Sequence, residues 1–360
     1  MRITDEKVRA ISRLAYDHNP FLHHLFESAG MNPHSDISGK ADLLKAYKKG
    51  VRTTGADVEK LYADYAPQLP TIEIWSSGSS SKSKKILVSR DALIRSSRGQ
   101  ERRDRASGIR DGERILRFNA DAPYSTSISS VPVLFHGSPR VRTLAFHLPS
   151  MPKNIAKAEK ARIAQSYIGM IYDFNPDHLR GGVFAVYNFA RFLMSYGLDT
   201  GKLSVRSVHL GGDPTTEEER MAIGKLWNAE PYDSYSSTEV NLIAYECHSH
   251  SGMHMNENEL FLTSVDPESG EEVGRKENGR DLCTCLYEAG ELPATFFLNY
   301  SHGDRIAVME ESCPCGDASS LISHPTRDGR KKLISGFGFD IKERPSIVKR
   351  AARKIGRSLS

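Results

Sequence analysis

A run of serine, glycine and lysine at residues 76–84, SSGSSSKSK, has the side-chain types that bind phosphate. Glycine and small hydroxyl residues let backbone N–H groups converge on phosphate oxygens, and Lys82 and Lys84 supply positive charge. A flexible serine-rich linker is the alternative interpretation. The strand-like stretches on both sides of the run favour a triphosphate-binding loop, because a linker needs no flanking strands.

A second segment, YSSTE at residues 235–239, ends a short strand-like stretch with two serines, a threonine and a carboxylate. A carboxylate beside a hydroxyl suits Mg²⁺ and a phosphate oxygen, and the ring of Tyr235 could stack on a base. The alternative is an N-cap in which a hydroxyl starts the next helix. Taken alone, the segment favours the cap.

Two glycine turns are weaker signals. Gly211-Gly212-Asp213-Pro214 follows a buried strand, where glycine lets a ligand approach the backbone, but a plain strand-to-helix turn explains it as well. The segment YSHGDR at residues 300–305 contains Asp304, whose carboxylate could accept hydrogen bonds from both hydroxyls of a ribose. An ordinary hairpin turn is the alternative there.

The five cysteines all lie in the last third of the chain, and an odd, clustered number argues against a disulfide framework. Thiolates and imidazoles suit tetrahedral Zn²⁺, which usually takes four protein ligands in a structural site. The candidate ligands are Cys247, His254, Cys313 and Cys315, with His248 or His250 able to replace His254. The alternative is two unrelated turns with incidental cysteines. Cys283 and Cys285 alternate along a strand-like stretch and are interpreted as buried small hydrophobes.

Alternating strands and helices must position these segments. Periodicity predicts helices at 5–66, 155–170, 182–196 and from Thr216, with a Thr216–Glu219 capping box, to about Asn228. It predicts strands at 71–75, 86–89, after 108, at 204–210 and at 231–235, and mostly strand and turn beyond 256. Such alternation indicates an α/β core with parallel strands.

Composition excludes some classes of function. Of the 360 residues, 39% are hydrophobic, and the net charge of +4 fits small anionic substrates but is no nucleic-acid signature. No apolar run approaches the roughly 18 residues of a membrane span. The first residues, MRITDEKVRAISRL, lack the apolar stretch of a secretion signal. We therefore expect a cytoplasmic protein without membrane or nucleic-acid partners.

Taken in order, these segments resemble the adenylate-forming superfamily of acyl-CoA synthetases, peptide-synthetase adenylation domains and luciferases. Within it, the phenylacetate-CoA ligases and the coenzyme-F synthetases, which adenylylate a deazaflavin, are most similar. The phosphate run is similar to S-G-[ST]-[ST]-G-K-P-K, residues 235–239 to Y-G-x-T-E and residues 303–305 to G-D-R. Residues 18–33, 175–193 and 207–220 resemble three further stretches of the phenylacetate-type enzymes, so the resemblance spans about residues 10 to 320.

The resemblance implies a role for each matching residue. Ser77, Gly78, Ser79, Ser80 and Lys82 would cradle the β- and γ-phosphates of ATP. Thr238 would contact the α-phosphate, Glu239 would hold Mg²⁺, and Lys82, Thr238 and Glu239 would carry catalysis. Tyr235 would stack on adenine, with Ser237 beside it, and Asp304 would bind the ribose. Gly211, Gly212 and Asp213 would border the adenine and acyl pockets. Some phenylacetate-type members carry two short segments, one with cysteine and histidine and one with two cysteines, that are comparable to the segments with the candidate zinc ligands.

The implied reaction is attack of a carboxylate on the α-phosphorus of ATP, which expels pyrophosphate and forms acyl-AMP. This chemistry needs positioning and charge neutralisation rather than a covalent nucleophile, and no Ser-His-Asp triad is legible. The acyl group would then pass to a thiol, of CoA or a carrier protein, or to an amine. The alternatives are an adenylyltransferase that leaves AMP on its substrate and a degenerate, non-catalytic nucleotide-binding protein.

The sequence departs from the family at several positions. Ser81 and Ser236 replace glycines and Ser83 replaces a proline, so a positive φ at 81 or 236 would be strained. Only 55 residues follow Arg305, so we expect the C-terminal lid to be truncated or absent. The expected architecture is an α/β adenylate-forming domain over 1–320, with mixed and parallel sheets flanked by helices and a β-rich subdomain, then a short basic remnant of the lid over 321–360. A homodimer remains open.

Overall fold

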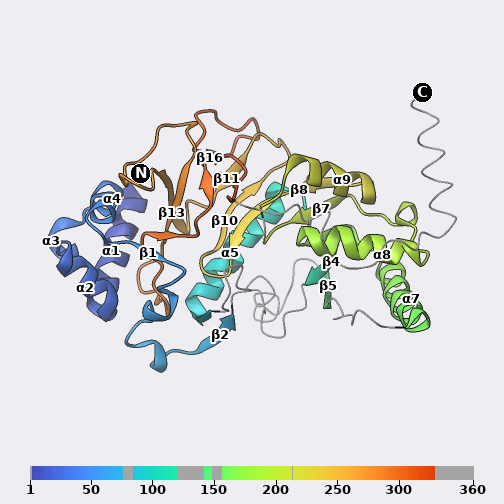
Figure 1. Ribbon diagram of the computed structural model, residues 1–360, viewed down its shortest axis with the longest axis horizontal. Helices are drawn as coiled ribbons and strands as arrows, with labels where there is room; N and C mark the ends of the chain where they lie inside the picture. The colour runs from blue at the N-terminus through green and yellow to red at the C-terminus, as the bar shows by residue number, and fades with distance from the viewer. Residues whose placement is uncertain (1, 76–83, 120–141, 148–155, 213, 329–360) are drawn as a thin grey trace. The chain divides into compact units, whose positions relative to one another are not determined.

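The computed structural model describes residues 2–75, 84–119, 142–147, 156–212 and 214–328 (Figure 1). These residues form two compact units. The first contains residues 2–75, 84–109 and 233–328, and the second contains residues 110–119, 142–147, 156–212 and 214–232. The division falls inside the expected 1–320 domain. Most of the expected lid remnant lies outside the described residues.

Unit 1 begins with helices, as the sequence predicts. They are α1 (Arg2–His18), α2 (Pro20–Ser28), α3 (Pro33–Asp36) and α4 (Lys40–Lys48). Asn19 caps α2 by accepting a 2.7 Å hydrogen bond from the Leu22 N–H, and Pro20 opens the helix with the φ angle that a first turn requires. The predicted helical stretch to residue 66 is too long, because Gly50 adopts a φ of +108° and β1 (Thr53–Thr54) follows. Only the short 3₁₀ turns η1 (Val58–Lys60) and η2 (Ala66–Gln68) come after it.

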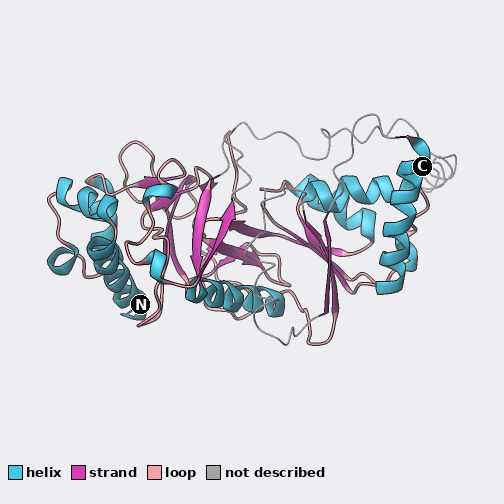
Figure 2. Ribbon diagram, turned by 90° about the horizontal axis from the view of Figure 1, so that it is seen from below, coloured by secondary structure: helices cyan, strands magenta, loops and turns pink. Residues whose placement is uncertain are grey.

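Three sheets complete unit 1. One has the order β1-β14-β13-β12, with β15 also paired to β13; another has the order β16-β11-β10-β9; the third is the hairpin of β2 and β3. Their strands are β2 (Thr71–Trp75), β3 (Lys85–Ser89), β9 (Ser234–Ser237), β10 (Asn241–Glu246), β11 (Met253–Met255), β12 (Leu260–Val265), β13 (Gly279–Cys285), β14 (Tyr300–Ser301), β15 (Arg305–Ile306) and β16 (Leu321–Ile322). Helix α5 (Arg90–Ala106) contacts β3 and β10 (Figure 2).

Unit 2 contains the predicted parallel sheet, with strand order β5-β4-β6-β7-β8 and every pair parallel. Its strands are β4 (Arg114–Asn119), β5 (Arg142–His147), β6 (His178–Gly181), β7 (Ser207–Leu210) and β8 (Glu230–Tyr232). Its helices are α7 (Lys157–Phe174), the π-helical turn η4 (Phe184–Phe189), α8 (Ala190–Ser195), the 3₁₀ turn η5 (Thr200–Lys202) and α9 (Glu217–Trp227). Both hydrogen bonds of the predicted Thr216–Glu219 capping box are present at the start of α9.

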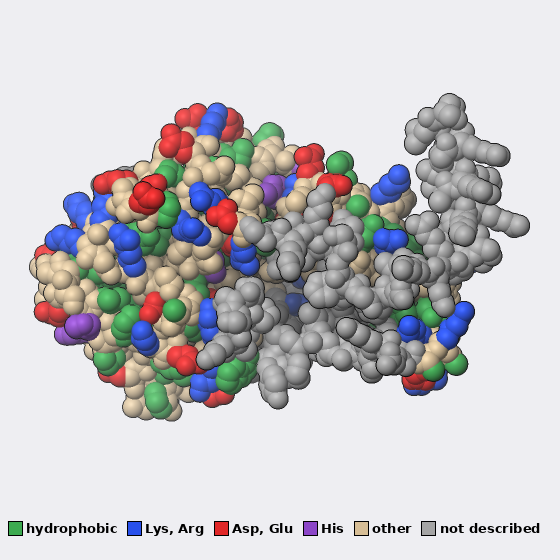
Figure 3. Space-filling model, viewed as in Figure 1, with side chains coloured by type: hydrophobic (Ala, Val, Ile, Leu, Met, Phe, Trp, Pro, Cys, Tyr) green, Lys and Arg blue, Asp and Glu red, His purple; other side chains and the backbone are tan. Residues whose placement is uncertain are grey.

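Each unit has its own apolar core. Phe26, Ile74 and Phe296 are fully buried in unit 1, and Trp227, Phe118 and Phe189 are buried in unit 2. On the face drawn in Figure 3, acidic and basic side chains are interspersed among the described atoms. Among the described residues, no helix has both the length and the apolar character to span a membrane.

Candidate adenylate-binding site and cysteine–histidine cluster

The YSSTE segment forms a β-hairpin turn in unit 1. Strand β9 ends at Ser237 and the antiparallel β10 starts at Asn241, so no helix follows and the N-cap alternative is wrong. Thr238 and Glu239 lie half-buried in the turn between the strands. Ser236 is not among the residues with positive φ, so serine in place of the family's glycine is not strained at this position.

The YSHGDR segment folds against the same hairpin. Strands β14 and β15 both pair with β13, and Gly303, with a φ of +88°, makes the turn between them. The Tyr235 hydroxyl donates to the Asp304 carboxylate at 3.0 Å, and the Ser237 Oγ lies 2.8 Å from His302 Nε2. Two of the three segments expected to surround one ATP therefore meet in unit 1.

The third segment, the serine-rich run with Ser77, Gly78, Ser79, Ser80 and Lys82, lies outside the described residues. Its flanking strands β2 and β3 form the predicted antiparallel hairpin, with Trp75 opposite Lys85. Lys84, which precedes β3, is described. The Lys84 ammonium and the Tyr300 hydroxyl both lie against the Cα of Gly55. Burial, followed by the nearby Glu239 carboxylate, raises the pKa of the Tyr300 hydroxyl, so the base of this hairpin lies near the turn that carries Glu239.

Asp281, on β13, organises the site and was missed by the sequence reasoning. Its fully buried carboxylate accepts hydrogen bonds from three backbone N–H groups, those of His302, Gly303 and Asp304, at 3.0–3.1 Å. It also accepts from Ser301 Oγ, Tyr235 Oη and His302 Nδ1, the last at 2.6 Å. The sequence feature that could have indicated Asp281 is the single carboxylate in the apolar run DLCTCLY. Strand periodicity does not predict which loop such a carboxylate contacts.

Asp281 and His302 form a buried ion pair. Burial alone raises the pKa of Asp281, but the nearby His302 and the donated hydrogen bonds outweigh it and lower that pKa below its usual value. Burial lowers the pKa of His302, but Asp281, together with Glu239 and Asp304, raises it overall. The contacts that link the side chains of Asp281, His302 and Ser237 thus hold the 301–304 turn against the β9–β10 hairpin.

Two residues that are predicted to bind the nucleotide, Asp304 and Tyr235, already form hydrogen bonds with other protein groups. Asp304 is 1% exposed, and Arg327 donates to both of its carboxylate oxygens, at 2.6 and 3.0 Å. Tyr235 is 6% exposed, and burial, followed by the nearby Asp281 and Asp304, raises the pKa of its hydroxyl well above the usual value. A ribose at Asp304 must therefore share that carboxylate with Arg327, and a base can touch only a small part of the Tyr235 ring.

Gly211 and Gly212 lie in unit 2, directly after β7. Gly212 has a φ of +95°, a conformation that favours glycine. Asp213 lies outside the described residues.

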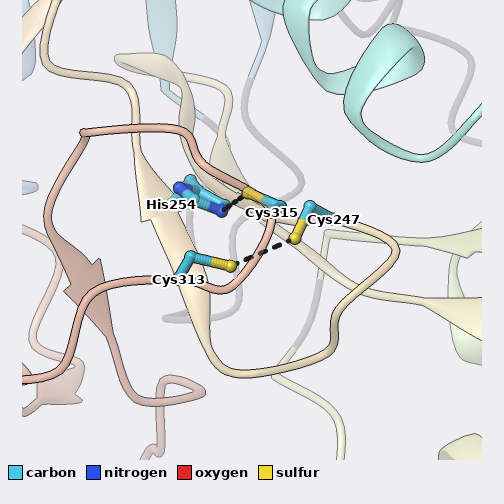
Figure 4. Close-up of side chains that lie close together, drawn as sticks. All are labelled: Cys247, His254, Cys313 and Cys315. Atoms are coloured by element: carbon cyan, nitrogen blue, oxygen red, sulfur yellow. Dashed lines mark hydrogen bonds between the residues drawn. The ribbon is translucent and has the colours of Figure 1, made fainter.

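The cysteine–histidine cluster comes together in unit 1 (Figure 4). Cys247 follows β10, His254 lies on β11, and the turn containing Cys313 and Cys315 precedes β16. One potential ligand atom from each residue lies within 4.8 Å of the others, with Cys247 Sγ 3.5 Å from Cys313 Sγ and His254 Nε2 3.3 Å from Cys315 Sγ. His248 and His250 are not part of this group.

The surroundings of the cluster suit a metal. His254 Nδ1 lies 2.9 Å from the Ser319 hydroxyl, which fixes the ring with Nε2 toward the sulfur atoms. The N–H groups of Ser249 and Asp317 point at Cys247 Sγ and Cys315 Sγ, each at 3.4 Å. Zn–S bonds of about 2.3 Å place tetrahedral ligands roughly 3.7 Å apart, close to the separations observed here.

Cys283 and Cys285 are each 1% exposed and belong to the core of unit 1, as predicted for small hydrophobes. Burial raises the pKa of both thiols. Cys283 Sγ also lies 3.7 Å from His302 Nδ1, and Asp281, Cys283 and His302 form a second group whose ligand atoms are close enough for one ion. The hydrogen bonds of Asp281 already explain that arrangement.

Comparisons with known proteins find similar sequences and similar folds. No family model matches the sequence. The phenylacetate-coenzyme A ligase of Thermus thermophilus is 22% identical over 321 residues, which cover 87% of this chain and 67% of the ligase. A structure of 2-hydroxyisobutyryl-CoA ligase in an open conformation with 2-HIB-AMP and CoA superposes with a TM-score of 0.73 at 16% identity, over 89% of this chain and 67% of that one. The same ligase in its thioesterification state gives a TM-score of 0.71 at 18% identity.

The chain therefore has the α/β fold of the adenylate-forming enzymes, and the resemblance recognised from its motifs is confirmed. In particular, it is similar to a phenylacetate-CoA ligase and to 2-hydroxyisobutyryl-CoA ligase, and it spans about two thirds of the length of each.

Proposed function

We propose that this protein is an AMP-forming ligase that activates a carboxylic acid with ATP and Mg²⁺. The observation that supports this most is the meeting of the Glu239 turn, the Asp304 turn and the base of the β2–β3 hairpin within one unit. Two segments with a predicted ATP-binding role meet there, and the hairpin whose loop has the third predicted role starts beside them. The names of the similar proteins, both CoA ligases, agree with this reaction.

In the proposed reaction, Glu239 holds Mg²⁺ and Thr238 contacts the α-phosphate. Ser77, Gly78, Ser79, Ser80 and Lys82 cradle the outgoing phosphates, and Asp304 holds the ribose. Tyr235 and Ser237 border the nucleotide, and Gly211, Gly212 and Asp213 border the adenine and acyl pockets. Mg²⁺ held by Glu239 would supply charge neutralisation for the leaving pyrophosphate. The sulfur of an acceptor thiol, such as that of CoA, then attacks the acyl carbon, and the acyl–phosphate bond breaks to release AMP.

Pyrophosphate release, screened across carboxylic acids, tests the proposal. An active acid should give Mg²⁺-dependent release that Glu239→Gln reduces by a factor of about 100 or more, as expected when a metal ligand is lost. Glu310→Gln is the matched control, because Glu310 is exposed and pairs with Lys276 elsewhere in unit 1. Release that is unchanged in Glu239→Gln would refute its role. Mass analysis of the product distinguishes a thioester from an AMP adduct. An AMP adduct as the final product would identify an adenylyltransferase.

We further propose that Cys247, His254, Cys313 and Cys315 hold a structural Zn²⁺, which would tie the β10–β11 hairpin to the segment before β16. Three thiolates and an imidazole are a common zinc set, and a closed set of four leaves no position for substrate. Metal analysis should find about one zinc per chain, lost in the double variant Cys313→Ser/Cys315→Ser together with a lower melting temperature. Cys283→Ala, which alters a thiol outside the cluster, should keep the metal. Zinc retained in the double variant would overturn the assignment.

A further inference from the structure

A cavity of about 680 Å³ lies in unit 1 beside the candidate adenylate site. Its lining comes from the end of α4 and β1, from the residue before β3, from β13 and from the turn after β14. The lining residues that matter here are Arg52, Thr54, Lys84, Arg280 and His302. The volume lies in the range of small-molecule sites. Arg52 and Arg280, unlike Lys84 and the 301–303 turn, have no role in the proposed adenylation.

The charge of the lining has one sign. Arg52, Lys84 and Arg280 contribute three cations, and the lining contains no aspartate or glutamate. Within the described part of the chain, the contacts of Arg52 and Arg280 are with backbone carbonyls and an aromatic ring rather than with carboxylates. Cationic side chains gathered around a cavity without internal counter-charges favour an anionic ligand.

Both arginines are held in place by contacts that leave most of their N–H donors for a ligand. Arg52 donates from Nε to the Tyr47 carbonyl at 2.8 Å, and its guanidinium lies 4.5 Å from the centre of the Tyr47 ring. Arg280 donates from one terminal nitrogen to the Gly303 carbonyl. A planar guanidinium carries five donors, and its fork matches two oxygens of a phosphate.

We propose that this cavity is a binding site for a phosphate group, held by Arg52 and Arg280. Two sources share this chemistry: the pyrophosphate expelled during adenylation and a phosphate of a phosphorylated acceptor thiol such as CoA. Both sources rest on the proposed function, whereas phosphate binding itself does not. The cavity reaches the adenylate site through His302, which contacts Ser237, and through Gly55, against which Lys84 and Tyr300 lie.

Calorimetric titration of the full chain with inorganic pyrophosphate, CoA and dephospho-CoA, without ATP or Mg²⁺, tests the proposal. At least one of these ligands should bind, and Arg52→Ala and Arg280→Ala should each raise its Kd about tenfold or more, as expected when a charged donor to phosphate is lost. Arg52→Lys keeps the positive charge but loses the forked guanidinium, so its Kd should lie between those of the unchanged protein and of Arg52→Ala. Arg98→Ala is the matched control, because Arg98 pairs with Glu291 outside the cavity. Melting curves should show that each variant is folded.

If pyrophosphate binds more tightly than CoA, the cavity binds the leaving group of the adenylation. If CoA binds more tightly than dephospho-CoA, the cavity binds a phosphate of the acceptor. Either result supports the site. If no phosphate compound binds, or if folded Arg52 and Arg280 variants bind as well as the Arg98 control, the proposal is wrong. The Glu239→Gln assay of pyrophosphate release fails or succeeds independently, so it distinguishes loss of the proposed function from loss of this site.

Discussion

Replacing Asp281 by asparagine should destabilise unit 1 far more than the loss of one surface ion pair would. The substitution keeps the shape of the side chain but removes the carboxylate of the fully buried Asp281, and it leaves His302, whose side chain is 6% exposed, without the partner that raises its pKa. Breaking one side of a buried pair costs about 3–5 kcal/mol of unfolding free energy. Because the carboxylate also accepts the three N–H groups of the 302–304 turn, we expect the upper part of that range.

The matched control is Asp64→Asn. Asp64 also pairs with a histidine, His18, at 3.1 Å, but the two side chains are 54% and 41% exposed, so the pair is worth less than about 1 kcal/mol. Thermal melting followed by circular dichroism should show a decrease on the order of 10 °C for Asp281→Asn and little change for Asp64→Asn. Equal melting temperatures for the two variants would refute the view that Asp281 organises the turn.

Three further predictions concern unit 2. Burial alone would raise the pKa of Glu113, but the Arg110 N–H, Arg206 and His178 lower it to about 2 from the usual 4.5. Glu113 therefore stabilises the fold above pH 4.5 and loses this contribution as the pH falls toward 2. Glu113→Gln should cost about 1–3 kcal/mol at pH 7 and progressively less between pH 4.5 and 2, whereas a pH-independent difference in melting temperature would contradict this. Thr216→Ala removes the capping box of α9 and should cost about 1 kcal/mol in chemical denaturation. Ser204→Ala, which removes an exposed hydroxyl away from the cap, is the control, and a loss below a few tenths of a kcal/mol in Thr216→Ala would count against the cap. Trp227→Phe removes the 2.9 Å hydrogen bond to the Val186 carbonyl and should cost about 1–3 kcal/mol in the same assay, and an unchanged midpoint would show that water replaces the bond.

Local patterns predicted much of the architecture. Alternation in TIEIW and the apolar run ILVS identified β2 and β3, and the Thr216 and Glu219 spacing identified the start of α9. The alternation of strands and helices between residues 114 and 232 predicted the parallel sheet. These features depend on residues a few positions apart, which a sequence displays directly.

The features that sequence reasoning missed depend on distant contacts. Tyr235 and Asp281 are 46 positions apart, and no periodicity relates them. The continuous strand predicted for 231–235 is instead divided into β8 and β9 at the boundary between the units. The pairing of Asp304 with Arg327 likewise depends on the tertiary fold, and it changes how a ribose can approach Asp304.

A crystal structure with a non-hydrolysable ATP analogue and Mg²⁺ tests the central claim most directly. We predict one nucleotide in unit 1, with its ribose hydroxyls at Asp304 beside Arg327 and its metal on Glu239. A nucleotide bound elsewhere, with Glu239 and Asp304 contacting only protein, would contradict the account.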